Sequence, residues 1–307
     1  MLETPPNGVV ILDKPEGMGS NRALGRLKHM AGLPRRGKAG FLGTLDPLAT
    51  GVLPVFIGKA TKLIPAFEHL DKTYRVTIRL GQTTNTLDAE GTLVSERSCE
   101  GLSGDTVREA VQGFVGEMEQ KVPEFSAVKI EGVPSYRLAR GGKPIPQRVR
   151  RVTFHQIEVE SVALPWVTCT LTCSPGTYVR ALARDLGERL AVGGHVTALR
   201  RLACGTLFTL ENCFSLEGIA DCLAKDDWHW LVNPAGFLLD HQPLTVEEPT
   251  ERQLREGRAI PLSDDLARLC PSTKVKALRP CGTLVAVGEV MPDPQGHMGF
   301  QPTKVLV

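Results

Sequence analysis

The sequence lacks paired cysteines at the spacing of a metal-binding or redox motif. Eight cysteines are scattered through 307 residues, and none forms a Cys-x-x-Cys pair. Cys169 and Cys173 share one face of the alternating segment 167–173, which predicts a strand. Free cysteine there behaves as a small apolar residue, whereas zinc needs closer pairs with further ligands. We therefore expect buried thiols and no metal site.

Long apolar runs and nucleotide-binding loops are missing as well. No stretch comes near the roughly 20 apolar residues that a membrane-spanning helix needs. Residues 1–6 have neither the basic nor the apolar region of a signal peptide. No Gly-x-Gly-x-x-Gly follows a predicted strand, and there is no Walker loop. These absences lead us to expect a cytoplasmic protein with no membrane contact and no cofactor.

What the sequence does contain is positive charge gathered in two places. The formal net charge is only +2, yet residues 13–40 carry seven basic and two acidic side chains. Residues 121–151 carry eight basic and two acidic side chains. Local basic excess on a nearly neutral chain is typical of a surface that docks a polyanion. On charge alone, a solvated basic surface explains the pattern equally well.

The pattern along the chain predicts an α+β protein of two parts. Residues 8–12 and 74–80 read as strands, as do segments near 152–160 and 167–173. Helices are expected from Ser20, which would cap the first, and over 179–190. Residues 120–150 are polar and basic, which indicates a surface insertion, and short strands between turns after about 245 indicate a small β-barrel.

The glycine-rich loop 43–51 contains the most unusual segment, Leu45-Asp46-Pro47. An Asp before Pro is held extended, with its side chain free to hydrogen-bond the turn. Taken alone, such an aspartate is most often a structural turn residue. Its functional interpretation rests on the surrounding motif.

The motifs of the chain resemble those of the TruB family of tRNA pseudouridine synthases over residues 8 to about 205. Gly43-Thr44-Leu45-Asp46-Pro47-Leu48-Ala49-Thr50-Gly51-Val52-Leu53-Pro54 is similar to the catalytic-aspartate motif of that family. Further segments resemble other motifs of the family and occur in the same order along the chain. They are Asp13-Lys14-Pro15, Lys72-Thr73-Tyr74, Thr84-x-Thr86-x-Asp88, Ser126-Ala127-x-Lys129, Gly176-Thr177-Tyr178-Val179-Arg180 and Leu199-Arg200-Arg201. More loosely, Gly257-x-x-Ile260 and Ala286-x-Gly288-Glu289 resemble a PUA-type RNA-binding module.

The resemblance implies a fold and a division of the chain. The fold is the pseudouridine synthase fold, a mixed, largely antiparallel central sheet flanked by helices and loops. Residues 1–240 would form the catalytic domain, with 120–150 as an insertion that grips RNA. Residues 245–307 would form a small PUA-like β-barrel domain.

The resemblance also implies the reaction, which is the isomerisation of uridine to pseudouridine, at position 55 in the T arm of tRNA. Asp46 would be the nucleophile, acting on a flipped-out base. A cation beside a carboxylate favours its charged form, and Arg180 would be that cation. Tyr74 would stack on the base and help the C5 proton leave, although it also reads as a core residue beside Val76 and Ile78.

Further residues are implied to contact the RNA. Lys14 and Lys129 would meet phosphates, and Tyr178 would hydrogen-bond near the catalytic pair. The remaining substrate-binding candidates are Phe41, Tyr136, Arg140 and Leu199. The partner would be the T-arm stem-loop of tRNA, with no protein partner and a monomeric enzyme.

The sequence departs from the family pattern in three places. Phe41 stands where His is usual, Asn85 replaces a usual Asp, and Glu124-Phe125 occupies the place of Pro-Tyr. An aromatic ring at 41 can still stack on a nucleotide, but the hydrogen bonds of an imidazole are lost. These departures bear on RNA docking and leave the chemistry in place.

Three other functions compete with this interpretation. A synthase for another RNA would share the motifs, and the absence of long Lys-rich tails argues weakly against a guide-dependent relative. A non-catalytic RNA-binding or tRNA-folding protein on the same scaffold would not need Asp46, Tyr74 and Arg180 together. A glycosidase would need two cooperating carboxylates, and only Asp46 lies in a suggestive loop.

Overall fold

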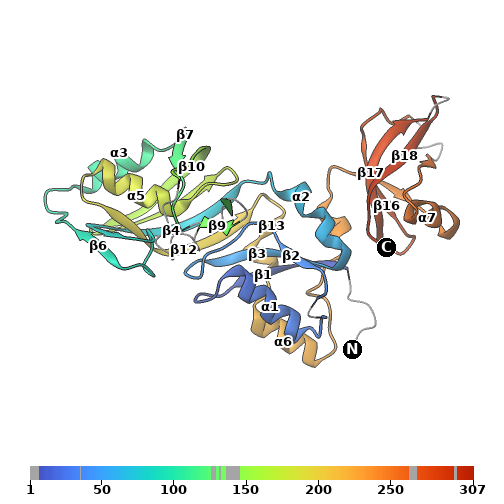
Figure 1. Ribbon diagram of the computed structural model, residues 1–307, viewed down its shortest axis with the longest axis horizontal. Coiled ribbons are helices and arrows are strands. Elements are labelled where there is room, and N and C mark those ends of the chain that lie inside the picture. The colour runs from blue at the N-terminus through green and yellow to red at the C-terminus, as the bar shows by residue number, and fades with distance from the viewer. Residues whose placement is uncertain are drawn as a thin grey trace.

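The protein consists of a large sheet with its helices and a smaller C-terminal sheet (Figure 1). The structure, a computed structural model, describes residues 7–307 apart from Arg35 and residues 126–128, 131–132, 136–145, 263–267 and 294–295; Lys129–Ile130 and Val133–Pro134 are described by their backbone. Among these residues, no helix is long and apolar enough to cross a bilayer.

The central sheet is mixed and largely antiparallel, as predicted. Its main path runs β1-β3-β12-β4-β11-β10-β7, with β2 paired to β3 and β13 paired to β12. The bounds are β1 Gly8–Lys14, β2 Ala39–Phe41, β3 Thr50–Ile57, β4 Lys72–Leu80, β7 Gly116–Lys121, β10 Val149–Ala163, β11 Trp166–Cys173, β12 Gly194–Cys204 and β13 Phe208–Thr209. Two short pairs lie outside it: β5 Gln82–Thr84 with β6 Leu93–Glu96, and β8 Lys129–Ile130 with β9 Val133–Pro134.

Alternating side chains explain why the middle strands form. On β4, every second residue from Tyr74 to Leu80 faces the core, while Arg75 is exposed. β11 pairs antiparallel with β4, and Cys169 and Cys173 lie buried on its inner face. The prediction of buried thiols is confirmed, and burial raises the pKa of both to about 12.

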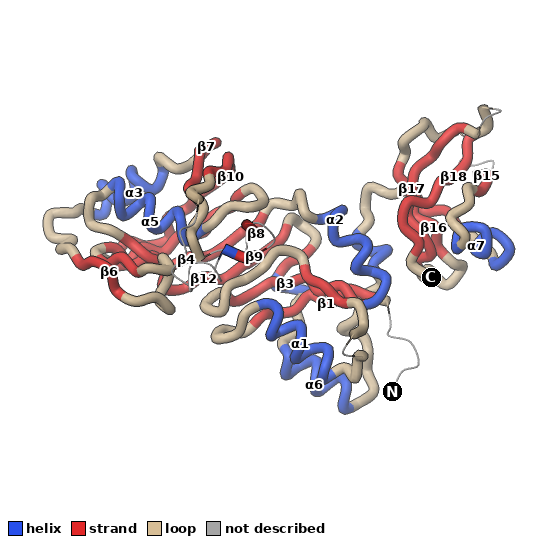
Figure 2. The backbone as a smooth tube through the Cα atoms, in the orientation of Figure 1, coloured by secondary structure: helices blue, strands red, loops and turns tan. Residues whose placement is uncertain are grey.

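The helices flank the central sheet at both ends. Their bounds are α1 Ser20–Met30, α2 Ile64–Phe67, α3 Gly104–Gln112, α5 Val179–Arg189 and α6 Leu216–Ala224, with 3-10 turns η1 Gly58–Leu63, η2 Leu210–Asn212 and η3 Pro234–Phe237. Figure 2 shows α1 and α6 side by side next to β1 and β3, where Arg26 pairs with Glu217 at 3.5 Å. α3 and α5 pack together at the other end, where the Arg189 guanidinium lies over the Phe114 ring.

The expected cap of the first helix is wrong in detail. Gly19 is the N-cap of α1, and Ser20 is its first residue. The Ser20 hydroxyl instead receives the amide of Leu45 at 2.7 Å and donates to the Leu45 carbonyl at 3.0 Å. A residue expected to begin a helix therefore fastens the loop that carries Asp46.

One parallel contact brings the functional segments together. β3 and β12 pair in parallel only at Thr50–Arg200 and Gly51–Arg201. Gly51 has φ +98°, and a Cβ there would stand 2.2 Å from the Arg201 carbonyl oxygen, so this crossing requires glycine. Because β12 also pairs with β4, the loop before β3 lies close to the start of β4.

The C-terminal sheet has the order β14-β16-β17-β18-β15. Its strands are β14 Gln242–Thr245, β15 Ile260–Pro261, β16 Lys274–Leu278, β17 Leu284–Pro292 and β18 Met298–Val305, with helix α7 Glu248–Arg255 beside them. A half-barrel sheet of this kind agrees with the PUA-like fold. The domain limits at residues 240 and 245 stay a prediction.

The two sheets are joined by apolar packing and by hydrogen bonds. Leu284, Val287 and Leu306 belong to the same buried cluster as Phe56 and Phe208 of the larger part. The Lys276 ammonium donates to the Ala235 and Leu238 carbonyls at 3.1 and 2.9 Å. The smaller sheet is thus docked on the larger part.

About half of the expected insertion at 120–150 falls outside the described residues. β7 ends at Lys121 and β10 begins at Val149, with β8 and β9 between them. Tyr136 and Arg140 lie outside the described residues, and the Lys129 side chain is not described. Their predicted contacts with RNA stay predictions.

Candidate active site

A cleft of about 330 Å³ lies where the loop before β3 meets β4, β12 and the start of α5. Its lining includes five residues predicted from the sequence, namely Asp46, Tyr74, Tyr178, Arg180 and Leu199. They come from four separate segments, since Tyr178 and Arg180 both stand at the start of α5, and the order of strands in the sheet brings these segments together. Leu199 contributes an apolar wall, and Tyr178 is the N-cap residue of α5.

Asp46 and Arg180 form an ion pair in this cleft. Arg180 Nε lies 2.9 Å from Asp46 Oδ2. The Asp46 side chain is 41% exposed and that of Arg180 is 7% exposed, so the carboxylate faces the open cleft and the cation is behind it. The contact predicted between these residues is present, and a charged pair at this distance orients the carboxylate.

The Arg180 guanidinium is held by two further segments. Its NH1 donates to the Thr86 carbonyl at 2.8 Å and lies 3.4 Å from Asp88 Oδ2. Its NH2 donates to the Phe125 carbonyl at 2.8 Å. Asp88 is itself buried and receives the Thr86 hydroxyl at 2.5 Å. These contacts leave the guanidinium little freedom to move away from Asp46.

Lys14 requires a correction, because its side chain is fully buried. Its ammonium donates to the carbonyls of Pro15 at 2.8 Å, Met18 at 2.6 Å and Pro47 at 3.4 Å. Burial lowers the pKa of Lys14 to about 8, partly offset by the nearby Asp46 carboxylate. In this arrangement Lys14 cannot meet a phosphate, and it braces the Asp46 loop from beneath.

Tyr74 lies at the floor of the cleft, near the start of β4. Burial raises the pKa of its phenol to about 12, although the neighbouring Arg201 lowers it. The hydroxyl therefore stays protonated at neutral pH. The interpretation of Tyr74 as a core residue is confirmed, and the residue also lines the cleft. Its stacking on a base stays a prediction.

Tyr178 is positioned through its backbone. Its amide donates to Gln120 Oε1 at 2.8 Å, and Gln120 Nε2 donates back to its carbonyl at 3.1 Å. Gln120 is buried at the end of β7. This double hydrogen bond fixes the start of α5 and thereby the point from which Arg180 projects.

Phe41 does not line the cleft. It ends β2, pairs with Val55 and packs against the main core. The other two departures are placed by their hydrogen bonds: Asn85 Oδ1 accepts the Thr92 amide at 2.9 Å, and Phe125 supplies the carbonyl for Arg180. The structure thus gives Phe41 a packing role, and its predicted contact with RNA stays untested.

Sequence reasoning assigned no role to three charged residues of the site. Arg201 is buried and donates from Nε to Val52 O at 2.6 Å and from NH2 to Gly43 O at 3.0 Å. Lys72 is buried in the cleft wall and donates to the carbonyls of Glu68 and Leu70. Asp88 backs Arg180. All three stand inside the quoted motifs. For Lys72 and Arg201, which lie on β4 and β12, a charged residue within a strand was the available signal.

Two other features of the molecule lie apart from the cleft. A cavity of about 670 Å³ at the junction with the C-terminal sheet contains none of the sequence-predicted site residues. Cys222, Asp227 and His229 place potential metal-ligand atoms within 4.8 Å of one another, but none lines the cleft. His229 Nδ1 already pairs with Asp227 Oδ2 at 2.7 Å.

The fold is shared with chains of two solved complexes. A chain in a structure of an H/ACA RNP bound to a substrate RNA containing 2′-deoxyuridine superposes with a TM-score of 0.68 at 22% identity, covering 98% of this chain and 85% of that one. A chain of a Cbf5-Nop10-Gar1 complex also gives 0.68, at 24% identity with the same coverage.

The chain belongs to the TruB family of pseudouridylate synthases. The family model for the N-terminal domain matches residues 28–179, and that for the tRNA pseudouridylate synthase B C-terminal domain matches residues 180–241. The tRNA pseudouridine synthase B of Geobacter sulfurreducens is 38% identical over 92% of this chain and 93% of its own. That of Cupriavidus metallidurans is 43% identical over 86% of each chain.

Proposed function

We propose that this protein isomerises uridine to pseudouridine at position 55 in the T arm of tRNA, with Asp46 as the nucleophile. The observation that carries the proposal is the half-exposed Asp46 carboxylate held 2.9 Å from a buried, fully engaged arginine. The relatives that span most of this chain are named tRNA pseudouridine synthase B. The proposal includes the expectations of a monomer and of no protein partner.

In the proposed reaction the target nucleotide leaves its stack and enters the cleft. The Asp46 carboxylate attacks either the uracil ring or ribose C1′, and the bond from C1′ to N1 breaks. The uracil turns, C1′ forms a bond to C5, and the bond to Asp46 breaks, which returns the free carboxylate. The C5 proton is lost while N1 gains one, so the reaction is an isomerisation with no net redox change.

The side chains around Asp46 divide the remaining tasks. Arg180 holds the carboxylate in one orientation. Tyr74 stacks on the flipped base, and its hydroxyl helps the C5 proton leave. Leu199 and Tyr178 shape the walls that exclude water. Exposed basic residues, among them Arg22 and Arg148, contact phosphates.

The experiment that tests the proposal uses an unmodified tRNA transcript. Wild type and Asp46→Asn are incubated with it, and pseudouridine is mapped along the chain. We expect product at position 55 with wild type and none above background with Asp46→Asn, because an amide is a far weaker nucleophile. Asp105→Asn, on an exposed turn of α3, is the matched control and should match wild type.

Two results would contradict the proposal. Wild type without any pseudouridine would favour the alternative of a non-catalytic RNA-binding protein. Asp46→Asn with wild-type rate would remove Asp46 as nucleophile. Product only in a different RNA would keep the chemistry and replace the substrate. Binding that survives Asp46→Asn would show that docking and chemistry are separable.

A further inference from the structure

Positive charge collects at the junction between the two sheets, outside the cleft. Lys38 precedes β2, Lys59 and Lys62 lie on η1, and Lys304 lies on β18. We call these four the junction lysines. All four are exposed, and among the described residues none of them forms an ion pair.

Hydrogen bonds hold the segments that carry the junction lysines near one another. The Lys38 carbonyl accepts the amide of Gly58 at 2.8 Å, next to Lys59. The Lys62 ammonium donates to the Val305 carbonyl at 2.7 Å, which places it beside Lys304. Burial lowers the pKa of Lys62, and the charges of Lys59, Lys38 and Lys304 lower it further. Like charges kept together without a counter-charge are a repulsive arrangement that a bound anion would relieve.

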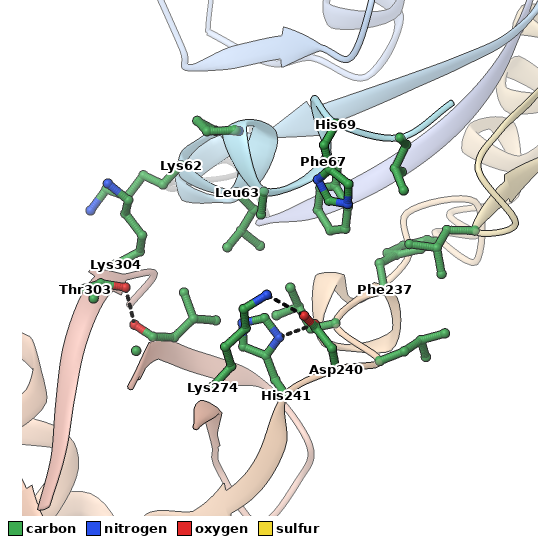
Figure 3. A pocket seen from close by; sticks show the side chains of 18 of the residues that line it. Lys62, Leu63, Phe67, His69, Phe237, Asp240, His241, Lys274, Thr303 and Lys304 are labelled. Carbon is green, nitrogen blue, oxygen red and sulfur yellow. Dashed lines mark hydrogen bonds and ion pairs between the residues drawn. The ribbon is translucent and has the colours of Figure 1, made fainter. Parts of the chain in front are cut away.

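Lys62 and Lys304 form one edge of the 670 Å³ junction cavity. Figure 3 shows them extending from opposite walls toward that edge. At the far side Asp240 is bound by Lys274 at 2.6 Å and by His241 at 2.7 Å, so its charge is offset locally. Glu289 also lines the cavity. The uncompensated positive charge is therefore confined to the edge formed by the junction lysines.

The position of this edge suits a ligand that also reaches the cleft. Glu68 and Lys72 line the cleft, whereas Phe67 and His69, in the same segment, line the junction cavity. One segment of chain thus separates the two hollows. If one nucleotide of a polyanion enters the cleft, its neighbouring nucleotides can cross this segment and reach the junction cavity.

We propose that the junction lysines bind the phosphate backbone of the RNA substrate, at nucleotides other than the one that enters the cleft. This inference rests on the proposed function for the identity of the polyanion. Lysine acts here as a point charge on phosphate, which adds affinity without reading sequence.

The test measures the salt dependence of binding to an unmodified full-length tRNA transcript. The variant is Lys59→Ala/Lys304→Ala, because neither side chain makes a hydrogen bond or ion pair among the described residues, so folding should be intact by thermal unfolding. We expect weaker binding and a slope of log Kd against log salt that is shallower by roughly 1 for each lysine lost. Pseudouridine formation at saturating RNA should equal that of wild type.

The control is Lys225→Ala, an exposed lysine in the acidic stretch 211–227, which should leave the slope unchanged. An unchanged slope in the double variant, or an equal loss in Lys225→Ala, would overturn the inference. The inference would also be overturned if the double variant lost binding to anionic lipid vesicles while its salt slope with RNA stayed unchanged. That result would favour a membrane surface as the partner of the junction lysines. Failure of the proposed function can be distinguished from failure of this inference. The former appears as a lack of pseudouridine with wild type, whereas the salt slope of tRNA binding is measured without any reaction.

Discussion

At the scale of single residues, Arg180 links three distant segments through one planar group. It pairs with Asp46, approaches Asp88 and donates to the carbonyls of Thr86 and Phe125. The TruB motif predicted the partnership of Asp46 and Arg180. It assigned no role to Asp88, because nothing in a short Thr-x-Asp segment says which cation it will face once the chain is folded.

Asp88→Asn should slow catalysis through Arg180. With one carboxylate gone, the guanidinium is free to shift away from Asp46, and misplacement of this kind costs on the order of 10²-fold in turnover. RNA affinity should change little, and Asp88→Glu should restore part of the rate. Single-turnover kinetics on tRNA transcript measure both. Glu160→Gln, which breaks an exposed pair with Arg75, is the control that should keep wild-type turnover.

Tyr74→Phe separates the ring from the hydroxyl. The pKa of about 12 keeps the phenol protonated at neutral pH, so the hydroxyl can act as a donor or a relay but is not a standing base. We expect RNA affinity to persist, since stacking uses the ring, and turnover to fall by about 10²-fold or more. Tyr74→Leu should lose affinity as well. Wild-type turnover in Tyr74→Phe would assign this residue to stacking alone.

At the scale of elements, the strands and helices follow local pattern closely. The alternation in residues 74–80 and 167–173 predicted the faces of β4 and β11, and the apolar stripe over 179–190 predicted α5. The loop between β2 and β3 was not predictable in the same way. Its shape depends on Ser20 from α1 and Arg201 from β12, which bond its backbone from two sides.

Lys14, which lies under this loop, should make the free energy of unfolding depend on pH. Burial lowers its pKa from 10.5 to about 8, so between these values the unfolded chain keeps a proton that the native protein has released. The free energy of unfolding therefore rises with pH across this window. The comparison is with Lys14→Met, whose side chain cannot titrate. Relative to that variant, the free energy of unfolding of wild type should rise by up to about 3 kcal/mol between pH 8 and 10.5.

Urea unfolding at a series of pH values measures that difference. Lys225→Met is the matched control, since an exposed lysine should show no such change relative to wild type. A constant difference between wild type and Lys14→Met across the window would mean that Lys14 is not desolvated in the native protein.

At the scale of the whole molecule, basic side chains are concentrated in two segments, although the formal net charge is only +2. Arg22 on α1 and Arg148 before β10 are both exposed, and they come from the two basic segments of the sequence. The polyanion predicted from those segments fits a family that modifies RNA. Which of the basic residues touch it depends on the surface that folding creates.

Arg22→Ala and Arg148→Ala should each weaken binding to tRNA whatever the tRNA sequence. Each should also reduce the slope of log Kd against log salt by roughly 1. Fluorescence anisotropy across a salt series measures this, with turnover at saturating RNA as the check that the cleft is intact. An unchanged slope in either variant would remove that arginine from the interface.

By itself the sequence determined the α+β pattern, the buried faces of the strands and the motif around Asp46. These depend on neighbours two to four residues away, so they can be read along the chain. Only the tertiary structure decided that Lys14 lies buried under the loop, that Asp88 backs Arg180 and that Lys62 bonds to β18 beside Lys304. Those pairings join segments far apart in the chain, and their energies arise from burial and charge in a space that exists only after folding.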